Sequence, residues 1–137
     1  MDDPVFEDLI YEKKNHVVTI TMNRPEVHNA FRGRTCSELV QAFGRAGYDP
    51  DVGAIVITGE GSAFCAGGDM VGFYPSDPGP FAMMRGPRTL VQELVNCEAP
   101  VISEVNGVAA GLGATTAVPA ALLLIAPHAR ICDSRLH

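Results

Sequence analysis

The chain has 137 residues, a length that suits one domain of ordinary size. Hydrophobic residues make up 47% of it and charged residues 19%, which is the composition of a folded globular protein and excludes a disordered chain. Ten Lys and Arg residues against sixteen Asp and Glu residues give a net charge of −6, which excludes the basic surface of a nucleic-acid-binding protein. We therefore expect a single domain over residues 1–137 with no nucleic-acid partner.

The first half of the chain alternates strand and helix patterns. Residues 17–22 alternate β-branched and apolar side chains with period two, as a strand does, whereas residues 35–46 place apolar side chains at helical spacing. The step from Lys14 to Asn15 suits a hairpin turn. The expected elements in chain order are strands over 6–13 and 16–22, a helix over 35–46, a strand over 53–58 that is covered on both faces, and a glycine-rich loop over 59–68.

The second half continues the alternation. Prolines exclude regular structure over residues 74–80, which we expect to form a surface loop. A helix over 89–97, a strand over 101–105, a turn at Asn106 and Gly107, a helix over 111–120 and a buried strand over 122–125 then follow. This order predicts an α/β fold whose parallel strands are joined by right-handed crossovers.

The sequence predicts neither an export signal nor a membrane span. Its first residues are acidic with no apolar run behind them, and the four cysteines never pair as C-x-x-C. We expect free thiols, no metal site and a cytoplasmic protein. Residues 105–127 carry no charge, but they contain Asn, Gly, Thr and Pro, and only residues 118–126 are strongly apolar. That run is too short to cross a bilayer, so we expect a buried core and no membrane.

Two glycine-rich turns are the main candidates for chemistry. Residues 66–69 and residues 111–113 each follow a strand and lead toward a helix, and glycines let a ligand approach the backbone amides closely. If the turns converge, two N–H groups point at one oxygen and form an oxyanion hole, which stabilises charge that develops on a carbonyl. The alternative interpretation is purely structural: the same glycines form tight turns, and Asp69 is a helix N-cap.

Three motifs resemble the crotonase (enoyl-CoA hydratase/isomerase) superfamily, in the same order. They cover the chain from residue 17 to about residue 131, and only the acidic start and the last positions fall outside them. The motifs are VVTITMNRPEVHNAF at 17–31, AIVITG with SAFCAGGD at 54–59 and 62–69, and APVISEVNGVAAGLG at 99–113.

The resemblance implies a crotonase-like spiral of ββα units, truncated before the C-terminal helical part, that binds acyl-CoA thioesters as a lyase of fatty acid metabolism does. It implies that the amides of Ala66 and Leu112 hold the thioester oxygen. Coenzyme A would enter as part of the substrate, with no separate cofactor, and the family forms homo-oligomers, trimers or hexamers. The substrate-binding positions carried over are Ala66, Gly67, Gly68, Asp69, Val27, His28 and Leu112.

The chain departs from the family at the catalytic carboxylates. The two glutamates that hold and deprotonate water in hydratases align with Thr115 and Arg135, and neither side chain is a carboxylate base. Asp133 is the preferred substitute, ahead of Asp69 and Glu104. Glu26 stands where many members carry a basic residue, so phosphate contacts fall to backbone amides or to arginines. The chain also ends well before family members do, which is typical of a fragment or a degenerate paralogue.

Other functions remain open on the sequence alone. A catalytically inactive CoA-binding or assembly module keeps the fold without the reaction. A dinucleotide-binding domain is disfavoured because both partial G-x-G matches lack the final glycine, with Phe64 and Thr116 at that position. Serine catalysis is disfavoured because no G-x-S-x-G occurs. Cys65 could be reactive beside the first turn, although a packed thiol is the more common state of a free cysteine.

Overall fold

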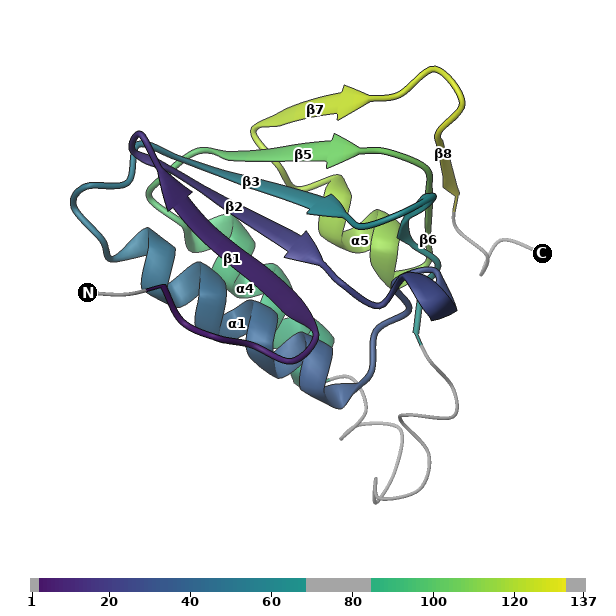
Figure 1. Ribbon diagram of the computed structural model, residues 1–137, viewed down its shortest axis with the longest axis horizontal. Helices are drawn as coiled ribbons and strands as arrows, with labels where there is room; N and C mark the ends of the chain where they lie inside the picture. The colour runs from purple at the N-terminus through teal and green to yellow at the C-terminus, as the bar shows by residue number, and fades with distance from the viewer. Residues whose placement is uncertain (1–2, 69–84, 133–137) are drawn as a thin grey trace.

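The computed structural model describes residues 3–68 and 85–132, which form two β-sheets with helices packed against them (Figure 1). The larger sheet has the strand order β1-β2-β3-β5-β7. Its strands are β1 (Leu9–Lys14), β2 (Val17–Met22), β3 (Ala54–Gly59), β5 (Val101–Val105) and β7 (Leu122–Ile125). Only β1 runs antiparallel to its neighbour, so the sheet is otherwise parallel, as the α/β pattern predicts.

The β1–β2 hairpin forms where the sequence places it. Asn15 and His16 take positive φ angles of 53° and 67°, as both central residues of a type I′ turn do. In β2, Val18, Ile20 and Met22 are at most 1% exposed and face the core. β3 alternates in the same way, with Ile55 and Ile57 buried and its other apolar side chains partly exposed, so the expectation that β3 is covered on both faces is wrong.

Two helices cover the inner face of the larger sheet. α1 (Gly33–Gly47) and α4 (Arg85–Asn96) lie side by side beneath the strands (Figure 1). Leu39 and Phe43 of α1 and Leu90 and Leu94 of α4 are the apolar positions that fill the core, at most 5% exposed. α5 (Leu112–Ala117) packs near the other end, and η1 (Pro25–Val27) follows β2. No described helix is long and apolar enough to cross a membrane.

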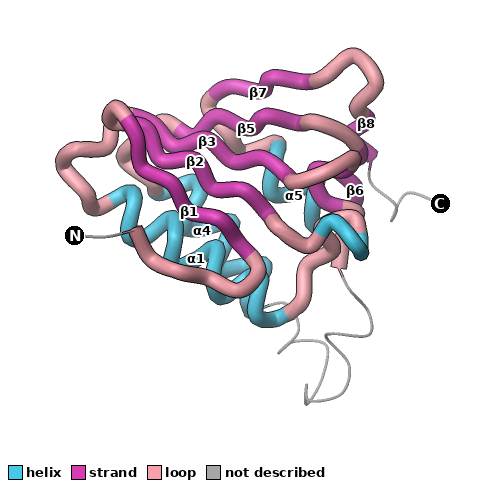
Figure 2. The backbone as a smooth tube through the Cα atoms, viewed as in Figure 1, coloured by secondary structure: helices cyan, strands magenta, loops and turns pink. Residues whose placement is uncertain are grey.

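A second, smaller sheet is the main feature that the sequence does not predict. It consists of three parallel strands in the order β4-β6-β8, at one end of the larger sheet (Figure 2). β4 (Ala63–Cys65), β6 (Val108–Ala110) and β8 (Arg130–Cys132) have three residues each. Three residues are too few to show a period, so the sequence pattern does not separate these strands from loops.

Two further expectations are wrong at the C-terminal side. The helix predicted over 111–120 ends at Ala117, so Pro119 lies beyond it and does not kink it. β7 forms as predicted but is not buried: Leu122, Leu124 and Ile125 are about half exposed, and β7 is the last described strand at that edge of the sheet.

A buried ion pair ties the N-terminal segment to the start of α1. The Asp8 side chain is 2% exposed and accepts hydrogen bonds from Arg32 Nε at 2.9 Å, Arg32 Nη2 at 2.6 Å and Thr35 Oγ1 at 2.7 Å. Burial by itself raises the pKa of Asp8, but the hydrogen bonds from Arg32 and Thr35 and the positive charge of Arg32 outweigh it and leave that pKa below its ordinary value. Glu38 in turn accepts the Asp8 amide at 2.8 Å.

Glycine is required at two close approaches, one between the turn after β5 and the turn before β4, and one between α5 and β4. A Cβ on Gly107 would collide with the Ser62 carbonyl, and one on Gly113 would collide with the carbonyl of Cys65 and lie 2.9 Å from its Cβ. Gly44 differs, because a Cβ added there would meet no atom within 4 Å outside the backbone of α1 itself.

We expect Asp8→Asn to destabilise the fold by about 1.5–3 kcal/mol at neutral pH, the range for a lost hydrogen bond to a charged group. Because the folded-state pKa is lowered, the contribution is complete above the ordinary pKa of 3.8 and is lost as the pH falls through the folded-state value. The stability difference between wild type and D8N, measured by denaturant unfolding, should therefore shrink in acid. A difference that stays constant into strong acid contradicts this role.

We expect Gly113→Ala to cost about 1–3 kcal/mol, as overpacking does, because α5 must move away from β4. Gly44→Ala is the matched control, and it should stabilise the chain by about 0.5–1 kcal/mol because alanine is the better helix former. The unfolding temperatures of both variants, compared with that of wild type, measure these two effects. Equal midpoints would show that the contact between α5 and β4 is not tight.

Candidate functional site

The smaller sheet brings the two glycine-rich turns together. Its three strands are parallel, so their carboxyl ends lie at one edge. β4 leads into residues 66–68, β6 leads into Gly111 and Leu112, and β8 ends at Cys132. Since β4 and β6 are direct neighbours, the two turns lie side by side. This is the convergence that an oxyanion hole needs, and it comes from the strands that the sequence does not reveal.

Backbone distances show that the turn after β4 and the turn after β6 lie close together. A Cβ on Gly67 would lie 3.3 Å from the carbonyl oxygen of Ala110, at the end of β6. The Gly111 amide donates to the carbonyl of Cys132 at 3.1 Å, which links the second turn to the end of β8. Gly67 and Gly111 both take positive φ angles, 118° and 54°, which glycine adopts without strain.

The first turn presents a different amide from the expected one. The Ala66 amide, predicted as an oxyanion donor, donates to the carbonyl of His28 at 3.0 Å and is therefore engaged. The Gly67 amide points at Cys65 Sγ, 3.4 Å away. The Gly68 amide donates to no other described residue, and Gly68 is exposed. The free donor of this turn within the described chain is thus Gly68 rather than Ala66.

In the second turn, the Leu112 amide is the candidate donor. Leu112 is the first residue of α5, so its amide has no acceptor inside the helix, and none of the other described residues accepts it. The Thr115 hydroxyl, at the position of the first hydratase glutamate, donates to the Gly111 carbonyl at 3.1 Å. This hydroxyl is hydrogen-bonded within the first turn of α5, and a threonine hydroxyl is not a carboxylate base.

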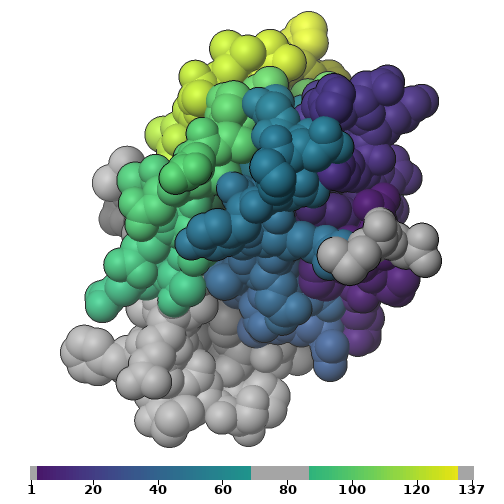
Figure 3. Space-filling view, turned by 90° about the vertical axis from the view of Figure 1, so that its left-hand side faces the viewer, coloured from purple at the N-terminus to yellow at the C-terminus, as the bar shows by residue number. Residues whose placement is uncertain are grey.

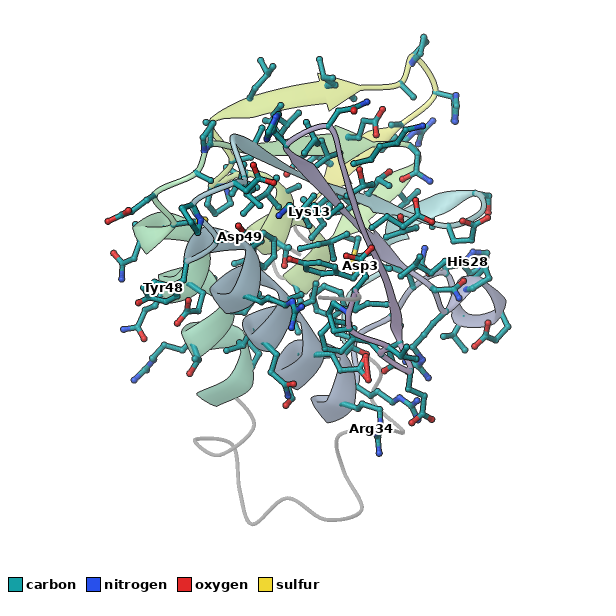
Figure 4. All side chains as sticks on the ribbon, turned by 60° about the vertical axis from the view of Figure 1, so that its left-hand side comes forward. Asp3, Lys13, His28, Arg34, Tyr48 and Asp49 are labelled. Carbon is teal, nitrogen blue, oxygen red and sulfur yellow. The ribbon has the colours of Figure 1, made fainter. Side chains whose placement is uncertain are left out.

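The loop over residues 23–31 lies directly against the first turn. His28 accepts from Ala66, and the Phe31 amide donates to the Gly67 carbonyl at 2.8 Å, so residues 28–31 run beside residues 66–68. Val27 and His28 are exposed on the outer side of this loop, and Figure 4 shows His28 at the margin of the molecule. Both residues expected to bind substrate are thus accessible next to the turn.

Two asparagines, which the sequence reasoning missed, hold the turn between β3 and β4. Asn29 is 2% exposed, and its Nδ2 donates to the carbonyls of Glu60 at 2.9 Å and Ala63 at 2.8 Å. Asn106 Nδ2 donates to Gly59 at 2.9 Å, Gly61 at 3.0 Å and Ala63 at 3.2 Å. Their position at the end of a strand or loop, with glycines nearby, is the signal that could have identified them, because an asparagine amide can satisfy turn carbonyls.

Cys65 and Glu104 are two described titratable residues close to the turns, and neither is placed as a catalytic base. Burial raises the pKa of the Cys65 thiol to about 12, so it is a packed thiol and not a nucleophile. Glu104 is exposed on β5 and hydrogen-bonds through no side-chain atom to the described part of either turn. Asp69, Asp133 and Arg135 lie outside the described residues. Residues 3–68 and 85–132 contain no group of three or more His, Cys, Asp and Glu residues that could hold a metal ion.

Comparison with known proteins identifies relatives over almost the whole chain. A sequence profile of the enoyl-CoA hydratase/isomerase family matches residues 12–136. The protein named "Probable enoyl-CoA hydratase EchA14" of Mycobacterium tuberculosis is 35% identical over 132 residues, which are 95% of this chain and 51% of the relative. The chain thus spans about half the length of the curated relatives it matches.

Solved structures agree. An enoyl-CoA hydratase/isomerase from Mycobacterium paratuberculosis superposes with a TM-score of 0.84 at 30% identity, over 92% of this chain and 52% of that one. One from Marinobacter aquaeolei superposes with a TM-score of 0.83 at 30% identity, over 90% and 50%. The mixed α/β fold is therefore about half of a crotonase fold, as the motifs imply. With the two glycine turns in place at the edge of the smaller sheet, the chain belongs to the enoyl-CoA hydratase/isomerase family.

Proposed function

We propose that this chain binds an acyl-CoA thioester and polarises its carbonyl oxygen between the amides of Gly68 and Leu112. The observation that carries the proposal is the placement of two unengaged amides, within the described chain, on adjacent turns after β4 and β6. Both turns reach the surface, so a ligand can approach them. When a proton leaves the carbon next to the thioester, negative charge develops on the oxygen, and two N–H donors stabilise it.

The coenzyme A end of the ligand would lie along the loop that holds Val27 and His28, in contact with the first turn. Arginine side chains contribute less to binding of the coenzyme A phosphates than the sequence implies. Arg32 is paired with Asp8, and Arg34 Nε lies 3.2 Å from Glu7 Oε2. Arg24 Nη1 donates to the carbonyl of Ala30 at 2.6 Å. We therefore assign the affinity mainly to backbone amides and apolar contacts, in a protein whose net charge of −6 opposes an anionic ligand.

The reaction that fits this chain differs from hydration by two glutamates. Thr115 is engaged with Gly111, and a guanidinium such as Arg135 stays protonated at neutral pH. We propose Asp133 as the base that removes the proton, because it follows β8 directly and β8 is the third strand of the sheet that carries both turns. The reaction class is then proton transfer next to a thioester carbonyl, in fatty acyl metabolism.

A second candidate is a CoA-binding module without turnover. The hydroxyl of Thr115 supports it, because this residue stands at the position of the first hydratase glutamate and donates to the Gly111 carbonyl. The two candidates share the binding site and differ only in whether a base acts on the bound ligand.

Leu112→Pro tests the binding site. Proline at the first helical position removes the amide donor and fits the helix, because that N–H has no partner in α5. We expect roughly tenfold weaker binding of crotonyl-CoA by calorimetry, as for a loss of about 1.4 kcal/mol. Leu112→Ala keeps the amide and is the matched control, with binding near that of wild type. Equal loss in both variants, or no binding by wild type, rejects the site.

Asp133→Asn separates the two candidates. Exchange of the α-proton of butyryl-CoA with D2O, followed by NMR, reports proton removal without any hydration. If the chain is a proton-transfer enzyme, we expect exchange with wild type and a loss of about 10²-fold or more in D133N, the contribution typical of a general base. Binding without exchange by wild type would favour the module without turnover.

A further inference from the structure

Cys65 is a buried thiol that the proposed reaction does not use. It is the last residue of β4 and is 0% exposed, so none of the molecular surface, one face of which Figure 3 shows, belongs to it. Because burial raises the pKa of this thiol to about 12, the sulfur keeps its proton at neutral pH. Such a thiol acts on its surroundings through hydrogen bonds and packing.

The Cys65 sulfur is hydrogen-bonded to both main-chain groups of Gly67. The Gly67 amide donates to Cys65 Sγ at 3.4 Å, and the thiol donates to the Gly67 carbonyl at 3.7 Å. The two residues are two positions apart, so the side chain closes a ring with the backbone of the first turn, as serine and asparagine side chains do in turns. The Gly67 amide is therefore directed toward the protein interior.

Three consecutive amides in the first turn follow β4, and two of them have an acceptor. The Ala66 amide donates to the His28 carbonyl at 3.0 Å, and the Gly67 amide donates to Cys65 Sγ. The Gly68 amide donates to no other described residue. Without the sulfur, the Gly67 amide would be a donor without a partner, which costs free energy, and the glycine backbone permits other orientations of that amide.

Cys65 also contacts the helix that carries the second donor. A Cβ on Gly113 would collide with the Cys65 carbonyl and lie 2.9 Å from the Cys65 Cβ. Gly113 directly follows Leu112, the first residue of α5. One residue is thus hydrogen-bonded through its side chain to the first turn and is packed through its main chain and Cβ against the start of α5.

We propose that Cys65 is a positioning residue: its thiol keeps the Gly67 amide turned inward, so that the Gly68 amide faces the ligand, and its contact with Gly113 sets the separation between the Gly68 and Leu112 amides. This proposal rests on the function proposed above, in which those two amides polarise a thioester carbonyl. It adds that a side chain that does not touch the ligand controls which amide donates to it.

Cys65→Ala and Cys65→Ser separate positioning from packing. Both variants lose the buried sulfur, so a packing role alone predicts similar losses in both. Serine, however, keeps a hydroxyl that accepts the Gly67 amide, since an N–H···O bond of about 2.9–3.0 Å suits its shorter side chain. Cys36→Ala is the matched control, because Cys36 is 1% exposed on α1 and burial alone raises the pKa of its thiol.

Infrared difference spectroscopy of crotonyl-CoA labelled at its carbonyl carbon measures how strongly the bound carbonyl is polarised. Two converging donors lower its stretching frequency. We expect C65A to lose at least half of the lowering seen with wild type, C65S to keep most of it, and C36A to match wild type. Circular dichroism verifies that each variant folds.

Amide hydrogen exchange of the ligand-free chain, followed by NMR, gives a second measurement that does not depend on acyl-CoA. In wild type the Gly67 amide should exchange at least tenfold more slowly than the Gly68 amide, and C65A should abolish most of this difference. Equal exchange of the two amides in wild type, equal carbonyl frequencies in wild type and C65A, or equal losses in C65A and C65S would each overturn the positioning role.

A failure of the underlying function has a different signature. If wild type binds crotonyl-CoA with an unshifted carbonyl frequency, or does not bind it, the oxyanion function is rejected even where the Gly67 amide is protected as expected. The positioning role of Cys65 is then rejected with it.

Discussion

The hydrogen bonds from two asparagine side chains to the turn over residues 59–63 hold the start of β4, the strand that leads into the first glycine turn. Asn29 reaches the turn from the loop after β2, and Asn106 reaches it from the end of β5. Both donate to the Ala63 carbonyl, at the start of β4. Because these donors are neutral and buried or partly buried, losing one would leave turn carbonyls without partners, which costs free energy. The turn over residues 59–63 positions β4. Because β4 pairs with β6, the glycine turn after β4 lies beside the glycine turn after β6.

The same contacts make the substrate loop and the first glycine turn one unit. Residues 28–31 bond to residues 66 and 67 through main-chain groups, and Asn29 bonds to the turn behind them. On the other side, Arg32 is held by the buried Asp8. A ligand that contacts Val27 or His28 therefore contacts a segment whose neighbours are the amides of the site. Pre-organised donors of this kind stabilise developing charge without having to reorient during the reaction.

The sequence predicts the long elements well and the short ones poorly, for physical reasons. α1 and the β1–β2 hairpin carry a clear period and a turn that suits positive φ angles, so both are predictable to within a few residues. β4, β6 and β8 have three residues each and are stabilised by pairing with one another, which is a non-local property. The exposure of β7 depends in the same way on which strand lies beside it, and local sequence does not report that.

At the candidate site, too, local sequence predicts some features, whereas others depend on contacts between distant residues. The motifs identify both glycine turns, because glycine is required where a Cβ would collide, as at Gly113. They do not identify which amide is free: Ala66 is engaged by His28, a contact between residues far apart in the chain, and within the described part of that turn only Gly68 is left. The most direct measurement of whether Gly68 and Leu112 form one donor pair is the 13C NMR shift of the carbonyl of a labelled acyl-CoA bound to the chain. Two converging donors predict a downfield shift relative to the free thioester, whereas a bound ligand with an unchanged shift would contradict the oxyanion hole.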